Sequence, residues 1–178
     1  MNDTRQQQSI EKVDLSQPPL LEVKDLKTYF YVNEGVLKAV DGVSFAIHQD
    51  ETLGLIGESG CGKSVTAHSI LRIVPSPGKL VGGQVLLRHD QQEINLAKLS
   101  PSGKMIRSIR GKDISMIFQE PMTSLSPVHT IGNQIREAIY LHQTQDKKEA
   151  QEIALDMLNR VGIANPTQRI NEYPHQLS

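Results

Sequence analysis

The chain of 178 residues has no tryptophan, a single cysteine and few aromatic residues, which make up 4% of the sequence. With Cys61 as the only cysteine, no disulfide can form within the chain, and this composition favours a reducing compartment such as the cytosol. Because aromatic side chains are scarce, the core must be built mostly from aliphatic residues.

Long apolar runs and an excess of charge are also missing. No run approaches the roughly 18 apolar residues of a membrane-spanning helix, and the polar start Met1–Ser9 lacks the apolar stretch of a secretory signal. The 19 basic and 20 acidic residues leave a net charge of −1, which gives no support for nucleic-acid binding by phosphate neutralisation. The histidines show no spacing typical of metal ligands. The sequence is typical of a soluble cytosolic protein.

The N-terminal part of the chain has the composition of pleated strands. Residues 1–19 are polar and end in two prolines, and we expect them to form a flexible leader. From Leu20 onward β-branched and aromatic residues are frequent, and Asn33-Glu34-Gly35 is expected to form a turn between strands. A second turn is expected at Asp41-Gly42.

Two short apolar runs have the character of strands buried on both faces of a parallel sheet. The first, Thr52–Ile56, leads into a glycine-rich loop, and the second is Ile114–Phe118. The other expected elements are a helix from Ser64 to about Ile73, a connection over 75–83, a strand at 84–87, a helix over 101–110, a helix carrying Ile131, Ile135, Ala138 and Ile139, and a helix that Asp146 and Glu149 begin as a capping box and Gly162 ends. Strands alternating with helices predict an α/β architecture with a β-rich entrance.

The strongest functional signal is the loop Gly57-Glu58-Ser59-Gly60-Cys61-Gly62-Lys63-Ser64, which matches the pattern G-x-x-x-x-G-K-[ST] in full. Glycines allow successive backbone N–H groups to point at phosphate oxygens, and the following helix adds its positive N-terminal end. Lys63 can reach the β- and γ-phosphates, and the Ser64 hydroxyl can bind Mg²⁺. The loop therefore predicts a nucleoside triphosphate ligand.

Plainer interpretations of this loop remain open. It could be a glycine-rich turn that caps a helix, although the buried strand before it and the helical pattern after it favour phosphate binding. Cys61 could be a reactive thiol near a helix N-terminus, but a small residue filling a variable position is the simpler interpretation.

The surrounding sequence resembles the ATP-binding subunits of ABC transporters. Residues 21–45 are similar to their opening β-subdomain, and Ile114 to Pro127 looks like their Q-loop segment. The sequence GESGCGKSVTA, in which Val65 follows Ser64, is similar to the D-type ATP-binding subunit of oligopeptide, dipeptide and nickel importers. The resemblance runs from about Leu20 to Ser178. It implies an α/β P-loop NTPase (ABC ATPase) core, incomplete, with an N-terminal antiparallel β-subdomain.

The resemblance also implies a ligand set, with ATP and Mg²⁺ as cofactors. Residues 57–64 and Val65 would bind the nucleotide, and Ser64 with Gln119 would lie at the metal. Gln119 would also approach the attacking water and sense the membrane subunits. Phe30 would stack on adenine, although Tyr29 and Tyr31 leave the register open by one residue and the cluster could instead pack the β-subdomain.

The implied partners are two transmembrane permease subunits, a second ATP-binding subunit and, indirectly, an extracytoplasmic solute-binding protein, with no nucleic acid. Such a subunit would lie peripherally on the cytoplasmic face of the membrane. The stretch from Pro121 to about His142 would face the coupling helices of the permease, but its apolar stripe could equally belong to the core.

The sequence ends at Leu177-Ser178, the first two letters of the family signature LSGG, and holds no Walker B Asp, catalytic Glu or switch His. We therefore expect residues 20–178 to be the N-terminal portion of the ATP-binding domain, without ATP hydrolysis of its own. The Thr52–Ile56 strand would then lack its neighbours. Two alternatives stay open: a non-catalytic remnant or interaction fragment with partial nucleotide binding, and another P-loop enzyme such as a kinase, which the Q-loop match disfavours.

Overall fold

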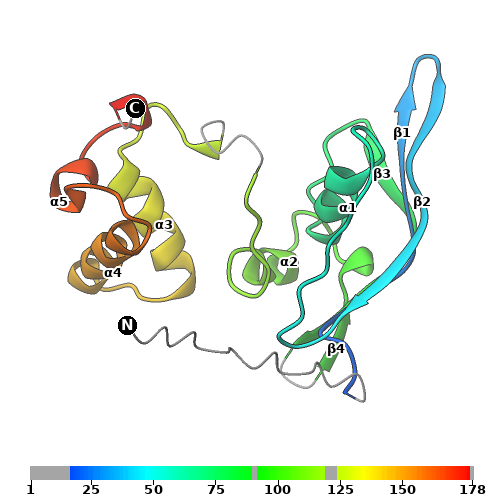
Figure 1. Cartoon of the computed structure of the whole chain (residues 1–178), viewed down its shortest axis with the longest axis horizontal. Coiled ribbons are helices and arrows are strands. Elements are labelled where there is room, and N and C mark those ends of the chain that lie inside the picture. Colours follow the sequence, from blue (N-terminus) through cyan, green and yellow to red (C-terminus); the bar gives the residue numbers. More distant parts are fainter. Residues whose placement is uncertain (1–16, 90–91, 119–123, 177–178) are drawn as a thin grey trace, which may run out of the picture. The chain divides into compact units, whose positions relative to one another are not determined.

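The computed structural model describes residues 17–89, 92–118 and 124–176, and the chain divides into two compact units between Ile106 and Arg107. The first unit contains β1 (Leu21–Val32), β2 (Gly35–Ile47), α1 (Lys63–Ile70), β3 (Gly78–His89), β4 (Gln92–Asn95), the 3-10 helix η1 (Leu96–Lys98) and the start of α2 (Lys104–Ile109) (Figure 1). The second contains the end of α2, α3 (Ile131–His142), α4 (Lys147–Arg160), α5 (Pro166–Arg169) and the 3-10 helix η3 (Pro174–Gln176).

A four-stranded antiparallel sheet with the order β2-β1-β3-β4 forms the first unit, and it confirms the predicted antiparallel β-subdomain. β1 pairs along both edges: Leu21 faces Ile47 on β2 and Leu87 on β3. The ladder between β1 and β3 ends at the pair Phe30 and Gly78, whereas β1 and β2 stay paired to Val32 and Gly35. The β1–β2 hairpin therefore projects beyond β3, as Figure 1 shows.

An irregularity crosses three strands of this sheet. The turn predicted at Asp41-Gly42 is wrong, because β2 runs through it with Gly42 as an extra residue between the pairs Lys27–Asp41 and Leu26–Val43. Asp25, Gly42 and Gly83 have φ values of 47°, 87° and 90°. A Cβ on Gly83 would lie 2.5 Å from the Asp25 carbonyl oxygen, so only glycine fits there.

The bulge at Asp25 decides which residues of β1 are buried. Strict alternation from Leu21 and Val23 would point residues 25 and 27 inward. The extra residue shifts the phase by one, so that Leu26 and Thr28 lie on the buried face instead. The aliphatic core that the composition predicts is completed in this unit by Val40, Leu71, Val85, Leu87, Leu96 and Ile106.

Neither of the two predicted buried strands forms. Among the described residues, Thr52–Ile56 joins no ladder, and Ile114–Phe118 contributes only an isolated bridge between Ile114 and Arg110. Ile56 is 95% exposed and Ile117 is 93% exposed. A strand buried on both faces needs neighbours to accept its backbone hydrogen bonds, and within the described part of the chain nothing takes that place.

Several element boundaries also differ from those predicted. The expected connection over 75–83 is partly strand, since β3 begins at Gly78, and α2 covers 104–109 of the expected 101–110. α1 ends at Ile70 rather than near Ile73. None of the helices that the structure describes has the length and apolar character to cross a membrane.

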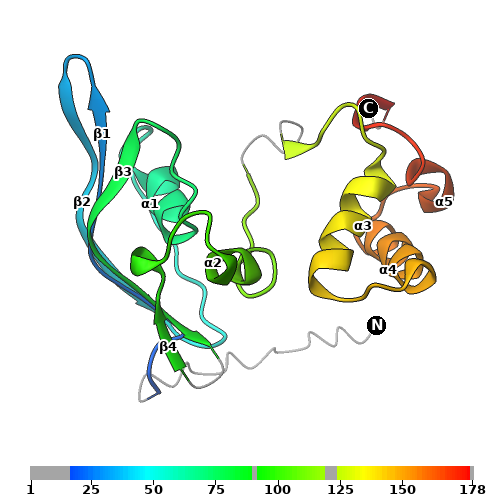
Figure 2. The ribbon, with the colours of Figure 1, turned by 180° about the vertical axis from the view of Figure 1, so that it is seen from behind.

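The second unit is a small helical cluster in which α3 and α4 lie side by side (Figure 2). Ile131, Ile139 and Ile170 are buried together with residues of α4, so part of the apolar stripe of α3 belongs to the core. The Asp146 carboxylate accepts a hydrogen bond from the Glu149 amide at 2.8 Å, as the capping prediction requires. The Glu149 carboxylate instead accepts from the Thr144 hydroxyl, and Gly162, with φ of 76°, follows the end of α4.

Candidate phosphate-binding site

The predicted phosphate loop connects the unpaired segment Thr52–Ile56 to α1. Gly60 and Gly62 have φ values of 83° and 94°, and their left-handed backbone turns the chain sharply on either side of Cys61. α1 begins at Lys63, one residue before the predicted start, with Gly62 as its N-cap. Because Gly62 has no side chain to cap the helix and the first turn holds no acidic residue, this helix end favours an anion.

Gly62 also allows the loop to pack closely against strand β2. A Cβ at this position would lie 2.2 Å from the Ala39 carbonyl oxygen and 3.5 Å from Val40 Cγ2. Ala39 is an extra residue in β2, between the pairs Thr28–Val40 and Tyr29–Lys38. The bulge therefore places a backbone carbonyl directly against the start of α1, and any side chain at position 62 would push the loop away from β2.

The Lys63 ammonium group folds back into the loop. Its Nζ donates hydrogen bonds to the carbonyl oxygens of Gly57 and Glu58, both at 2.7 Å, and lies 3.6 Å from Cys61 Sγ. A phosphate oxygen can replace either carbonyl as acceptor, since an ammonium group has three rotatable donors. The cation is thus already inside the loop that the glycine-rich pattern predicts to bind phosphate.

Cys61 has a packing role in the same loop. A Cβ on Gly57 would lie 2.5 Å from Cys61 Sγ, so the thiol occupies the space that the glycine leaves. This contact favours the simpler of the two interpretations, a small side chain filling a variable position of the pattern.

The segment before the loop is held by a local carboxylate contact. Glu51 accepts hydrogen bonds from the His48 backbone N–H at 2.7 Å and from His48 Nδ1 at 3.1 Å. The backbone donor, followed by the ring, lowers the pKa of the Glu51 carboxyl. Asp50, between them, has a φ of 58°, and the closed turn directs the chain from β2 into Thr52–Ile56.

Two hydroxyl groups of α1 form hydrogen bonds to its neighbours, one to the loop before it and one to the sheet. The Thr66 hydroxyl donates to the Gly62 carbonyl oxygen at 3.0 Å, which ties the helix to the loop. Three residues further along, the Ser69 hydroxyl contacts Thr28 on β1 at 2.7 Å. Ser64 is exposed at the second position of the helix, and Val65 is partly buried.

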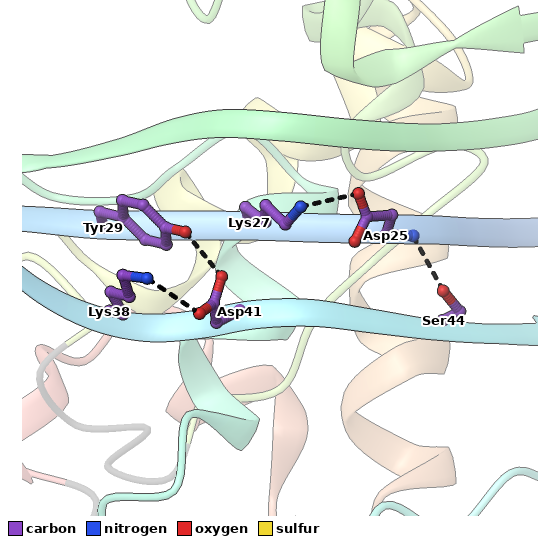
Figure 3. A network of polar contacts seen from close by, with 6 residues as sticks. All are labelled: Asp25, Lys27, Tyr29, Lys38, Asp41 and Ser44. Atoms are coloured by element: carbon purple, nitrogen blue, oxygen red, sulfur yellow. Dashed lines mark hydrogen bonds and ion pairs between the residues drawn. The ribbon is translucent and has the colours of Figure 1, made fainter.

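The aromatic cluster of β1 divides between the two faces of the sheet. Phe30 lies on the α1 side, where its ring and Val74 Cγ1 both border Gly78. On the other face the Tyr29 hydroxyl donates to Asp41 at 2.6 Å, with Lys38 beside it (Figure 3), and Lys79 lies 5.6 Å from the Tyr31 ring centroid. Only Phe30 of the three therefore shares a face with α1.

The charged contacts on that other face link residues of β1 and β2 and lie within the sheet rather than at the phosphate loop. The hydrogen bond from Tyr29 lowers the pKa of the Asp41 carboxyl, and the same bond raises the pKa of the Tyr29 hydroxyl. Asp25 accepts a hydrogen bond from Lys27 Nζ at 2.8 Å while its amide donates to the Ser44 hydroxyl at 2.8 Å, which completes the group in Figure 3.

The structure thus brings together the loop residues 57–64. Gln119 lies outside the described residues. Sequence reasoning missed the contributions of Ala39, Thr28 and Ser69, because a backbone carbonyl and two ordinary hydroxyls carry no pattern that marks them.

Comparisons with known proteins give one consistent family. The family described as ABC transporter matches residues 40–178. The chain is 51% identical over 96% of its length to "Probable peptide ABC transporter ATP-binding protein y4tR" of Sinorhizobium fredii, and covers 48% of that protein. It is 44% identical over 89% of its length to the dipeptide transport ATP-binding protein DppD of Bacillus subtilis, and covers 46% of it. The chain spans about half the length of the curated relatives it matches.

A similar fold is found in the dimeric structure of MJ0796, a bacterial ABC transporter cassette. The similarity has a TM-score of 0.73 at 22% identity and covers 89% of this chain and 63% of the other. A second structure of MJ0796, bound to ADP and Pi, is similar with a TM-score of 0.72 at 23% identity, over 89% and 63% of the two chains.

Proposed function

The chain belongs to the ABC transporter ATP-binding family, and from this premise we propose that residues 57–64 bind the phosphates of ATP within the ATP-binding subunit of a peptide importer. The observation that supports this most is the position of Lys63 Nζ inside the loop, 2.7 Å from two carbonyl oxygens that a phosphate can replace. The uncapped start of α1 favours the same negative charge.

Each part of the loop has a separate role in this proposal. Gly60 and Gly62 turn the backbone so that N–H groups can face the phosphates, and Lys63 supplies the positive charge. Ser64 would hold Mg²⁺ through its exposed hydroxyl, and Mg²⁺ would supply further positive charge at the phosphate oxygens. Phe30 would stack on adenine, and its place on the α1 side of β1 supports it over Tyr29 and Tyr31.

The proposal extends to the subunit of which such a domain forms part. ATP binding and hydrolysis would be coupled to solute uptake, with two permease subunits, a second ATP-binding subunit and, indirectly, an extracytoplasmic solute-binding protein as partners. The subunit would lie peripherally at the cytoplasmic face of the membrane. Gln119 would approach the metal and the attacking water in that assembly, and the segment 121–142 would face the permease.

Titration of the 178-residue chain with ATP and Mg²⁺ by calorimetry tests the proposed phosphate site. Lys63→Ala should weaken binding by at least about tenfold, because a charge-assisted contact to phosphate is lost. Lys24→Ala is the matched control, since Lys24 is exposed on the sheet and pairs with Glu22 at 2.8 Å. Equal losses in both variants, or no binding by the unmodified chain, would contradict the proposal.

A further inference from the structure

A buried pair of hydroxyl groups joins the sheet to the helix that follows the phosphate loop. Thr28 on β1 and Ser69 on α1 are both 0% exposed, and their oxygens lie 2.7 Å apart. Apart from these two residues and Thr66, the buried residues that the structure describes in this unit are aliphatic, with Leu26 and Leu71 among them. A hydrogen bond requires a particular orientation of its two groups. Apolar side chains at these positions would be buried equally well but would not set that orientation.

The direction of this hydrogen bond follows from its second partner. Ser69 donates its hydroxyl proton to the Val65 carbonyl oxygen at 2.6 Å. A serine hydroxyl has one proton, so Thr28 must be the donor in the contact between the two side chains. The chain of bonds runs from Thr28 through Ser69 to Val65, the residue directly after the phosphate-loop pattern.

The two ends of this series of hydrogen bonds lie close in sequence to the two parts of the proposed nucleotide site. Phe30, proposed for adenine, lies two residues after Thr28 on the same face of β1. Lys63 and Ser64, proposed for the phosphates and Mg²⁺, begin the helix that carries Ser69, and Thr66 ties that helix to Gly62 at 3.0 Å. A shift of α1 along β1 would therefore change the distance between the phosphate loop and the Phe30 ring.

We propose that Thr28 is a positioning residue that, through Ser69, fixes the distance between the phosphate loop and Phe30 and so favours a nucleoside triphosphate over a bare triphosphate. This inference rests on the proposed function of the loop. The loop holds its own shape through Lys63 and Thr66, so phosphate binding alone does not need Thr28. Simultaneous recognition of the base and the phosphates does need Thr28, because one connected ligand must contact the loop and Phe30 at the same time.

The test compares ATP with inorganic tripolyphosphate, each with Mg²⁺, on the 178-residue chain. Thr28→Val keeps the shape and the strand preference but removes the donor. It should weaken ATP binding by about fivefold or more and tripolyphosphate binding by less than about twofold, since base stacking is the contribution lost. Thr28→Ser should restore the ratio of the two affinities. In a Phe30→Ala background the Thr28→Val change should no longer affect ATP selectively.

Thr66→Val is the matched control, because it removes a hydroxyl of the same helix that contacts the loop instead of β1. It should weaken both ligands in parallel. A parallel loss in Thr28→Val would show a purely structural role and overturn the inference, leaving the phosphate site intact. If Thr28→Val does not fold, Ser69→Ala tests the inference in its place, by the same ratio of ATP affinity to tripolyphosphate affinity. Absence of Lys63-dependent binding of either ligand would overturn the proposed function and this inference together.

Discussion

Strand β1 and the segment Thr52–Ile56 both have strand-like sequences, yet only one of them is a strand. β1 has a partner on each side and buries Val23, Leu26 and Thr28 almost completely. Thr52–Ile56 joins no ladder among the described residues, and its Leu55 is 47% exposed. The difference shows that apolar composition selects a strand only where another strand completes its hydrogen bonds.

The largest expected change in stability comes from removing one apolar side chain from each of the two regions. Leu26→Ala should lower the free energy of unfolding by about 2–5 kcal/mol, because it leaves a cavity in a fully buried site. Ile56→Ala should change it by less than about 0.5 kcal/mol, because the side chain is already exposed. Urea unfolding of the two variants measures both values. Similar losses would mean that Ile56 is buried in solution and that the contrast is wrong.

A smaller effect is expected from backbone strain. Gly42→Ala must place a side chain at φ of 87° and 3.2 Å from Asp25 Oδ1, which should cost about 1–2 kcal/mol. Gly54→Ala, in the unpaired segment, has open space around it and no positive φ, and should be neutral or slightly stabilising. Thermal unfolding separates the two, and a neutral Gly42→Ala would argue that the bulge is not maintained.

The smallest effect concerns pH and the outer face of the hairpin. Tyr29 lowers the pKa of Asp41 below its ordinary value of 3.8, so the contact stabilises the fold above that value and is lost as the pH falls through the lowered one. Tyr29→Phe should raise the Asp41 pKa and make stability less sensitive to pH in this acid range. An NMR titration of the carboxyl carbon measures the shift.

Tyr31→Phe provides the control for this titration. Tyr31 lies on the same strand face near Lys79 and not beside a carboxylate in the contacts described for it, so its hydroxyl should leave the Asp41 pKa unchanged. An equal change in both variants would point to a general effect of removing a hydroxyl and would detach Asp41 from Tyr29.

The sequence alone determined the features that depend on residues close together in the chain. Residues 57–64 match the phosphate-loop pattern, and the pattern can be recognised in the sequence because it needs only adjacent glycines, a lysine and a serine. The turn at 33–34 and the cap of Asp146 on Glu149 are local in the same way, and both are confirmed. Capping and turn chemistry act within about four residues, so a linear pattern suffices to predict them.

Only the tertiary structure decided what depends on distant partners. The bulge at Asp25 chose Leu26 and Thr28 for the core, and the extra residue Ala39 placed a carbonyl against Gly62. The alternation of side chains along β1 placed Phe30 on the opposite face of the sheet from Tyr29 and Tyr31. The segment Thr52–Ile56 found no paired neighbour and lies outside the sheet that the structure describes. Strand pairing and its register join residues far apart in the chain, and their free energy is not contained in any local pattern.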